Sequence, residues 1–503
     1  MEHIDLALIH NWHNHKARQL KASILRHSGK TEEALKFIEE SLIIDKFNLG
    51  CRFEKYFIES NPVELQEMLS ILNGSVHNYI EYAFDFSSAG MYEEASRIMH
   101  TYIEEQTNIY PIAAYMLGYF ASMAGDKETA QKWYKKAQSL SPDKCFPNRI
   151  DEVNVLTDAM KMNPEDFKAP YYLGNFWYAH RRYEEATVCW ERSVEINNQF
   201  PTALRNLSLA YYNKKGRKEE ACRLLEKAFE LDQTDSRIFM ELDQLYKKMG
   251  RVHAERLTFL EAHLELVAQR DDLCIERITL YNQLGNYEKA RELIAARKFH
   301  PWEGGEGKVT GQYILCRVEL AKKAIKEKRY LEAISLLKET DHYPHNLGEG
   351  KLINAEENEV DYYKGIAYQK LGNEAESIKY LMKATQGSSE PQQAFYYNDQ
   401  QPDKIFYQGL AWRALGEESK ARSRFNKLID HGKKHLFDEC KIDYFAVSLP
   451  ELAIWEDDLN VRNKVHCYYV MALGYSGIGE EELAEEYYEK VKRLDVNKQV
   501  FRM

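Results

Sequence analysis

The tetrapeptide Gly-Glu-Gly-Lys occurs twice in this chain, at residues 305–308 and 348–351, and the two copies are 43 residues apart. Glycine allows another backbone to come close. Glutamate can accept hydrogen bonds or stabilise the start of the helix that follows it. If the interval reflects a structural repeat, the two copies lie side by side on one edge of the molecule.

Aromatic and amide residues occur in the neighbouring segments, which makes this region the candidate binding site. Acidic and amide groups beside exposed aromatic rings suit a sugar or a peptide as ligand. The predicted ligand-binding residues are Trp302, Glu303, Glu306, Glu349, Tyr396, Tyr397, Asn398 and Asp399. The alternative interpretation is that both loops are helix starts, whose glutamates cap the helix or pair with neighbouring side chains.

A phosphate-binding loop is excluded by the residues around both copies. Such a loop needs glycine, four further residues, then Gly-Lys followed by serine or threonine. In the first copy Trp302 stands where the first glycine belongs, and Val309 replaces the hydroxyl residue. In the second copy His345 and Leu352 occupy these two positions. We therefore expect no ATP and no other cofactor.

Two further groups of polar residues do not make a metal site or a catalytic site. His10, His13 and His15 do not keep the spacing of three or four that places ligands on one helix face, so we expect a polar, partly frayed N-terminus. A group of acidic residues near the C-terminus could act in acid–base chemistry on a glycoside, but such residues are also typical of a helix start. This group comprises Asp443, Glu451, Glu456, Asp457 and Asp458. Because no nucleophile–base set recurs, we predict no catalytic residue and no enzymatic activity.

Composition sets limits on partners and location. The net charge of −11 argues against nucleic acid or an anionic membrane as the main partner. The eight cysteines form no Cys-x-x-Cys pair, which favours reduced buried thiols over disulfides or zinc ligands. The N-terminus lacks a basic, then apolar, leader, and no apolar run approaches 18 residues. The sequence therefore predicts a cytoplasmic protein without membrane insertion.

The elements that must position these residues are helical hairpins, and residues 171–193 show the clearest one. Gly174 and Ala186 lack bulk and stand on either side of a basic turn, so two antiparallel helices can touch there. Trp177, Tyr183 and Trp190 fill the volume beside this contact. This stretch resembles a tetratricopeptide repeat, whose unit is a helix–turn–helix of about 34 residues. The resemblance implies a platform that binds proteins or peptides.

The same hairpin recurs along the chain. The position of the small residue near the start of the second helix recurs at Ala34, Ala95, Ala130, Ala186, Ala221, Glu255, Ala290, Ala333, Ser377, Ala421 and Ala484. Glu255 and Ser377 depart from alanine, so we expect looser packing or a shifted register in those two hairpins. The turn residue five positions earlier is glycine at 29, 90, 125, 250, 285, 372, 416 and 479, typical of a left-handed helix end. We predict an all-α, TPR-like superhelix of about eleven hairpins. Extra helices are expected near 46–74, as a degenerate hairpin, and at 151–163.

The connections change after residue 297, which divides the expected array into residues 1–297 and residues 298–503. Long connections are predicted at 300–313, 342–358, 392–407 and 442–463, and loops of this length are often functional. These four segments resemble the C-terminal half of uncharacterised bacterial multidomain proteins, in which a TPR array follows a β-sandwich similar to galactose mutarotase. No such β-rich region is present in these 503 residues, so the resemblance implies either a stand-alone array or part of a longer protein.

Two functional hypotheses follow. The first is a non-enzymatic scaffold that binds a protein or peptide on its concave face and its long C-terminal loops. The alternative is an accessory module of a carbohydrate-active protein, with a sugar site in the loops between 300 and 460. The sequence identifies neither the partner nor the oligomeric state.

Overall fold

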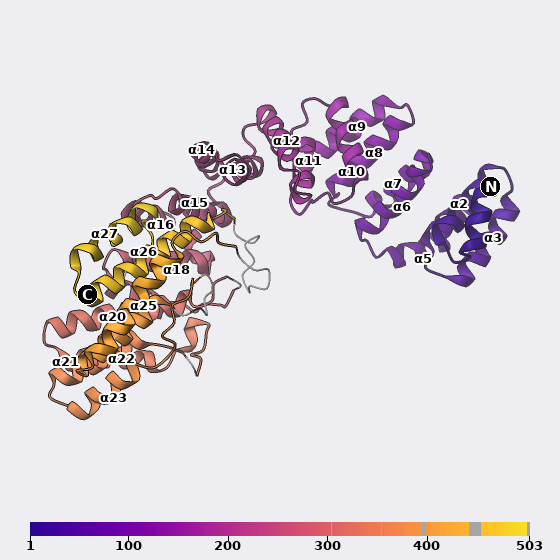
Figure 1. Cartoon of the computed structure of the whole chain (residues 1–503). Helices are drawn as coiled ribbons and strands as arrows, with labels where there is room; N and C mark the ends of the chain where they lie inside the picture. Colours follow the sequence, from indigo (N-terminus) through magenta and orange to yellow (C-terminus); the bar gives the residue numbers. More distant parts are fainter. Residues whose placement is uncertain (303, 354, 395–398, 400, 442–453, 500–503) are drawn as a thin grey trace. The chain divides into compact units, whose positions relative to one another are not determined.

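A computed structural model describes residues 1–302, 304–353, 355–394, 399, 401–441 and 454–499 of the chain. Across these residues the secondary structure is helical, with 27 α-helices, two short 3-10 helices and no β-strand (Figure 1). The predicted all-α fold is therefore confirmed.

The helices have the following bounds. They are α1 (Glu2–His10), α2 (His15–His27), α3 (Thr31–Ile44), α4 (Leu49–Glu59), α5 (Pro62–Leu72), α6 (Val76–Ser88), α7 (Tyr92–Glu104), α8 (Pro111–Met123), α9 (Lys127–Ser139), α10 (Asp151–Met162), α11 (Lys168–Ala179), α12 (Tyr183–Ile196), α13 (Pro201–Lys215), α14 (Lys218–Leu231), α15 (Ser236–Lys248), α16 (His253–Glu261), α17 (Leu264–Gln269), α18 (Asp271–Gln283), α19 (Tyr287–Ala296), α20 (Lys308–Lys326), α21 (Tyr330–Lys338), η1 (Glu339–Asp341), η2 (His345–Leu347), α22 (Asn358–Lys370), α23 (Glu374–Ala384), α24 (Pro402–Ala414), α25 (Glu418–His435), α26 (Leu459–Ile478) and α27 (Glu481–Leu494).

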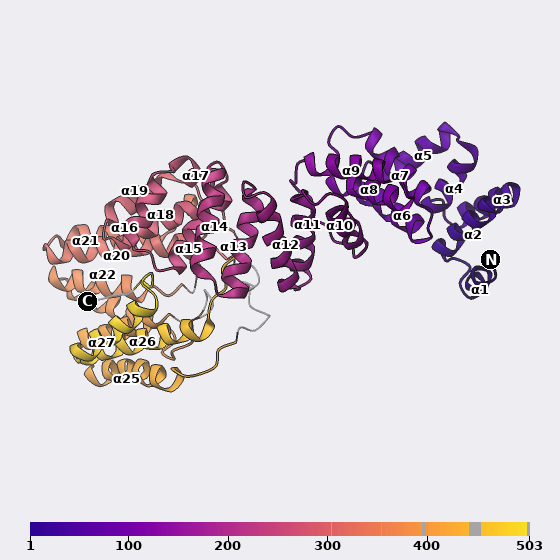
Figure 2. The same cartoon turned by 90° about the horizontal axis from the view of Figure 1, so that it is seen from above.

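Packing divides the chain into two compact units, Met1–Ala210 (unit 1) and Tyr211–Met503 (unit 2). The division expected after residue 297 rests on connection length and not on packing, and it stays a prediction. Figures 1 and 2 show the hairpins of each unit following one another in chain order.

The eleven predicted hairpins are present, and each expected small residue lies near the start of a second helix. Nine alanines at this position are at most 1% exposed, and Ser377 is 3% exposed, so Ser377 packs like the alanines, contrary to the expectation of looser packing. Glu255 is exposed, and the next residue, Arg256, is fully buried in its place. Here the buried register has shifted by one residue, as the sequence suggested.

The extra helices also appear where they were expected. Helices α4 and α5 form the degenerate hairpin, and α10 is the single helix between α9 and α11. Helices α1 and α17 were not predicted. The N-terminus expected to be frayed is helical instead, because Leu8 is 2% exposed and packs into the core of the first hairpin.

The hairpin turns use the left-handed conformation that the sequence predicted. The eight turn glycines have φ between +71° and +89°. Where glycine is absent, Arg181 and Lys328 adopt the same conformation, with φ of 60° and 62°. The left-handed residue ends the first helix and lets the second helix turn back against it.

The close approach at Gly174 differs from the prediction in one respect. A Cβ placed on Gly174 would lie 2.5 Å from the Trp190 ring, so the indole, and not Ala186, packs onto the glycine. The ring is fixed because Trp190 Nε1 donates to the Tyr171 carbonyl and to Asn175 Oδ1, both at 3.2 Å. Three other hairpins repeat this glycine with a large residue 16 positions later: Gly118 with Tyr134, Gly365 with Leu381, and Gly409 with Phe425.

In unit 2 the connection before α26 reaches back to the first helices of the unit. Trp455 is 2% exposed, and its Nε1 donates to the Glu241 carbonyl of α15 at 3.0 Å. Asn213 of α13 donates to the Ile454 carbonyl and accepts from the Glu456 amide, both at 2.9 Å. These contacts, called the Trp455 tie below, join the two ends of unit 2 around a central pocket.

Candidate functional site

The two Gly-Glu-Gly-Lys copies lie against each other. The Glu349 carboxylate accepts hydrogen bonds from the Gly307 amide at 3.1 and 3.2 Å and from Thr310 Oγ1 at 3.2 Å. Gly307 and Thr310 belong to the first turn of α20, whose amides have no partner within the helix. Glu349 therefore caps the helix of the preceding repeat, which is the arrangement that the alternative interpretation described.

Trp302 and Glu306 lie in the same pair of loops. The Trp302 ring packs beside the buried cluster of Phe299 and Val309, and a Cβ on Gly305 would lie 2.1 Å from it. Gly305 is thus required by the packing of Trp302. Glu306 is half-buried in the turn that follows.

The other predicted site residues are not joined to this pair of loops by a described contact. Asp399 precedes α24, and its carbonyl accepts from Gln401 Nε2 at 3.1 Å. Glu303, Tyr396, Tyr397 and Asn398 lie outside the described residues. The structure therefore brings together Trp302, Glu306 and Glu349 from the predicted set.

The acidic group before α26 forms ion pairs and a helix cap. Glu456 pairs with Lys214, and Asp457 pairs with Lys248. Asp458 accepts from the amides of Asn460 and Val461 at 2.9 and 3.2 Å, as a helix N-cap does. Asp443 and Glu451 lie outside the described residues. The described residues of this group thus match a helix start.

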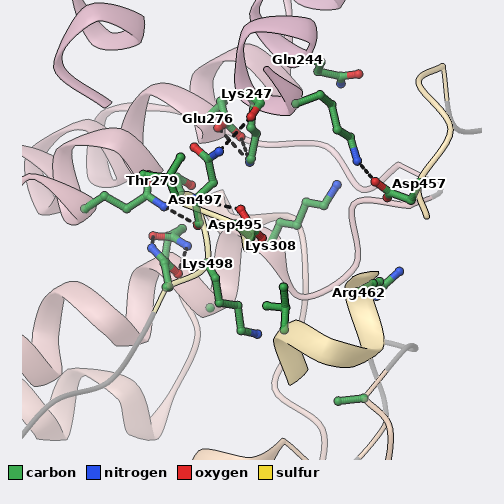
Figure 3. Close-up of a pocket in the computed structure, with 18 of the residues that line it drawn as sticks. Gln244, Lys247, Glu276, Thr279, Lys308, Asp457, Arg462, Asp495, Asn497 and Lys498 are labelled. Atoms are coloured by element: carbon green, nitrogen blue, oxygen red, sulfur yellow. Dashed lines mark hydrogen bonds and ion pairs between the residues drawn. The ribbon is translucent and has the colours of Figure 1, made fainter. Parts of the chain in front are cut away.

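A pocket of about 1060 Å³ lies inside unit 2 (Figure 3). Its walls come from α15, α18 and α20, from the start of α24 and of α26, and from residues 494–499 at the end of α27 and beyond it. Trp302 lines the pocket, whereas Glu306 and Glu349 do not. The predicted site and the pocket therefore meet only at Trp302.

One wall of the pocket is a buried charge network. Arg256 is fully buried and pairs with Asp243 at 2.6 Å and with Glu276 at 2.7 Å. Glu276 also pairs with Lys247 at 2.9 Å. Burial raises the pKa of Asp243, with Arg256 partly opposing this effect. Burial acts in the same sense at Glu276, but Lys247 and Arg256 outweigh it and hold the pKa of that carboxyl below its usual range.

The opposite wall holds a second buried pair. Lys404 of α24 lies 2.5 Å from Glu359 of α22 and 3.8 Å from Asp403. Burial raises the pKa of Glu359 although Lys404 opposes it. The acidic side chains of these two networks are thus already paired with cations, which keeps their side chains in place.

The segment after α27, residues 495–499, lies on the inner surface of unit 2 and is called the tail below. Asn497 is held at three points: its Nδ2 donates to the Lys247 carbonyl at 2.9 Å, its Oδ1 accepts from Arg256 at 3.2 Å, and its carbonyl accepts from Gln283 Nε2 at 2.8 Å. Gln499 exchanges hydrogen bonds with Gln312 of α20 at 3.1 and 3.3 Å. The inner surface therefore already binds a non-helical segment through amide groups (Figure 3).

The sequence analysis missed this pocket, although one signal was present. Glu255 was the position where a charged residue replaced alanine, and it stands beside Arg256, the centre of the buried network. The tail carries no motif, because the contacts described use one main-chain carbonyl and the side chains of one asparagine and one glutamine.

The described residues contain neither a candidate metal site nor a candidate membrane-spanning helix. They contain no group of three histidine, cysteine, aspartate or glutamate side chains that could hold a metal ion. None of the helices in this part of the chain is long and apolar enough to cross a membrane.

Comparison with known proteins identifies the repeats. Residues 112–144, 203–235, 362–386 and 465–497 match the tetratricopeptide repeat family. These segments coincide with the hairpins α8–α9, α13–α14, α22–α23 and α26–α27. The predicted repeat type is therefore confirmed, whereas no match supports the likeness to proteins with a galactose-mutarotase-like domain.

Solved structures of TPR proteins match the chain at low identity and low TM-score. The TPR domain of P58(IPK) is 15% identical, and the match covers 80% of this chain and 98% of that one, with a TM-score of 0.23. YrrB, described as a TPR protein with an unusual peptide-binding site, is 16% identical over 46% of this chain and 93% of its own, with a TM-score of 0.17. PilF of Pseudomonas aeruginosa is 16% identical over 43% of this chain and 87% of its own, with a TM-score of 0.26. At these TM-scores the matches carry no further conclusion.

Proposed function

We propose that unit 2 is a binding module that holds a segment of another protein in its central pocket, beside the tail. Tetratricopeptide repeats generally mediate binding to proteins or peptides, and their fold is typically a non-enzymatic scaffold. The proposal assigns that general role to a defined surface of this chain. It replaces the loop-edge site of the sequence analysis, since Glu349 is engaged as a helix cap.

The observation that carries the proposal is the way Asn497 is bound. A chain segment without regular structure must find partners for its main-chain groups when water is excluded. Gln283 donates a hydrogen bond to the main-chain carbonyl of Asn497. The Lys247 carbonyl accepts a hydrogen bond from the Asn497 side-chain amide, and Arg256 donates one to it. The tail already occupies these groups, and among the described residues the amide oxygen of Gln283 is buried without a hydrogen-bond partner. We propose that this oxygen accepts a main-chain N–H of the second segment.

The pocket beside the tail has the size and rigidity for such a ligand. Its volume of about 1060 Å³ lies at the upper end of the range for small-molecule sites, which suits several residues of a peptide. Because the charged side chains of its walls are paired, little ordering is required on binding, and this favours affinity.

The experiment selects random peptides displayed on phage against the full chain. The selected peptides are then measured by fluorescence anisotropy against Gln283→Ala and against Gln131→Ala, a control that changes an exposed glutamine of α9 in unit 1. We expect Gln283→Ala to weaken binding by about tenfold, because a hydrogen bond worth about 1.5 kcal/mol at the groove is lost or displaced, and Gln131→Ala to leave it unchanged.

Two results would count against the proposal. One is that no peptide is enriched; the other is that enriched peptides bind Gln283→Ala and the parent chain equally. A glycan array run with the same protein tests the carbohydrate alternative. Saturable binding of a glycan without any peptide binding would favour that alternative.

A further inference from the structure

The acidic and the basic side chains that line the pocket differ in whether they have a described partner. Every acidic side chain in the walls has a described partner. Asp243 and Glu276 pair with Arg256, Glu359 with Lys404, Asp272 with Arg270, Glu456 with Lys214 and Asp457 with Lys248, while Asp458 and Asp495 accept main-chain amides. No described carboxylate of the pocket therefore demands a cation from a ligand.

Two lysines of the pocket are in the opposite situation. Lys308 is the first residue of α20, and Lys498 belongs to the tail, and both line the pocket (Figure 3). Among the described residues, neither ammonium group lies within ion-pair distance of a carboxylate, although Lys498 lies 5.2 Å from the centre of the Tyr469 ring. Asp458 and Asp495 have no described cation partner either, but main-chain amides satisfy them, and Asp403 lies 3.8 Å from Lys404. The two ammonium groups are thus available to an anionic group of a ligand.

The surroundings of the two lysines disfavour their charged forms. Burial lowers the pKa of Lys308 and the nearby Lys247 adds to that effect, while Glu276, Asp272 and Glu306 oppose it. Burial also lowers the pKa of Lys498, where Asp403 and Asp495 oppose it and Arg462 adds to it. Lys308 also stands at the positive end of the α20 dipole. Lys308 is exposed at the pocket rim and Lys498 is partly buried, so both ammonium groups can be reached by an anionic group of a ligand.

The two ammonium groups do not converge on one point. In Figure 3 the Lys308 side chain extends towards the side of the pocket where Asp457 lies, whereas the Lys498 side chain extends away from it. A single small anion cannot contact both, but an extended ligand with more than one negative group can.

We infer that the ligand of the unit 2 pocket is an acidic peptide segment whose carboxylates are received by Lys308 and Lys498. The inference rests on the proposed function, since it names the chemistry of the segment that the same pocket holds. The net charge of −11 does not oppose it, because the field inside a pocket follows its local charges.

The test uses the full chain and two fluorescein-labelled peptides, one of alternating glutamate and serine and one with glutamine in place of each glutamate. We expect the glutamate peptide to bind at least tenfold more tightly and to weaken as salt is raised. Lys308→Gln and Lys498→Gln should each reduce its affinity several-fold. Lys326→Gln, an exposed position at the other end of α20, serves as the control and should have no effect.

Other results overturn the inference in distinguishable ways. If both peptides bind equally and both require Gln283, the acidic preference is wrong while the proposed function stands. If the glutamate peptide requires the two lysines but is indifferent to Gln283→Ala, the inference stands and the main-chain recognition is wrong. If inorganic phosphate or an oligothymidylate binds through these lysines and the glutamate peptide does not, the ligand class is wrong.

Discussion

Gly174→Ala is expected to destabilise unit 1, although alanine is the better helix former. The added Cβ would lie 2.5 Å from both Cδ1 and Nε1 of Trp190, and the ring is held by Tyr171 and Asn175. Overpacking of this kind costs about 1–3 kcal/mol. Moving the indole also loses a hydrogen bond of about 1 kcal/mol, whereas alanine gains about 1 kcal/mol over glycine in a helix. The expected net loss is about 1–3 kcal/mol.

The matched control is Gly311→Ala in α20. A Cβ at Gly311 meets no atom within 4 Å, so only the helix propensity changes and stability should rise by about 1 kcal/mol. Urea unfolding followed by circular dichroism and tryptophan fluorescence measures both variants. If the two substitutions stabilise the protein alike, the packing of Trp190 on Gly174 is not a close contact.

A second substitution separates the clash from other causes. In a Trp190→Leu background the ring is absent, so Gly174→Ala should lose most of its cost. The coupling between the two positions should then be about 1–3 kcal/mol, as expected for residues in direct contact. Additive effects of the two changes would refute the argument.

Three further predictions concern unit 2. Glu349→Ala should lower the free energy of unfolding by about 1 kcal/mol, because the α20 cap is lost. Glu306→Ala should change the free energy of unfolding little. Equal effects of the two substitutions in urea unfolding would contradict the capping role. His466 is buried, and burial lowers its pKa to about 3, so the unfolded chain binds a proton that the folded chain refuses. Stability should therefore fall as pH drops from 6.5 to 5, by about 2 kcal/mol from this residue, and His466→Gln should abolish that part of the loss in urea unfolding at the two pH values. Trp455→Ala should cost about 3–5 kcal/mol in the same assay, as for a buried tryptophan; a loss no larger than that of an exposed tryptophan would show that the tie is not formed.

The fold could be predicted from the sequence because the same hairpin pattern recurs many times along the chain. Most alanines at the start of a second helix have a glycine five residues earlier, and the two together set both the packing and the turn. The shift at Glu255 was visible for the same reason, since a departure from a regular pattern is easy to detect.

The candidate site could be predicted only in part. Sequence spacing showed that Glu349 lies near Gly307, but it did not show whether a carboxylate faces a ligand or a helix end. The pocket depends on contacts over long sequence separations, such as Trp455 with Glu241 and Asn497 with Lys247. No local pattern records such contacts, because each partner looks like an ordinary residue of its own segment.

The Trp455 tie also bears on how quickly a ligand can enter and leave. An open groove receives a protein segment from the side, at association rates of about 10⁵–10⁷ M⁻¹s⁻¹. The tie runs from the start of α26 back to α13 and α15. If it closes one side of the pocket, the segment proposed above can enter from that side only when the tie opens. Opening of the tie would then limit association, and the same motion would delay release. A free chain end would enter faster than an internal segment of the same sequence, and loosening the tie would remove that difference.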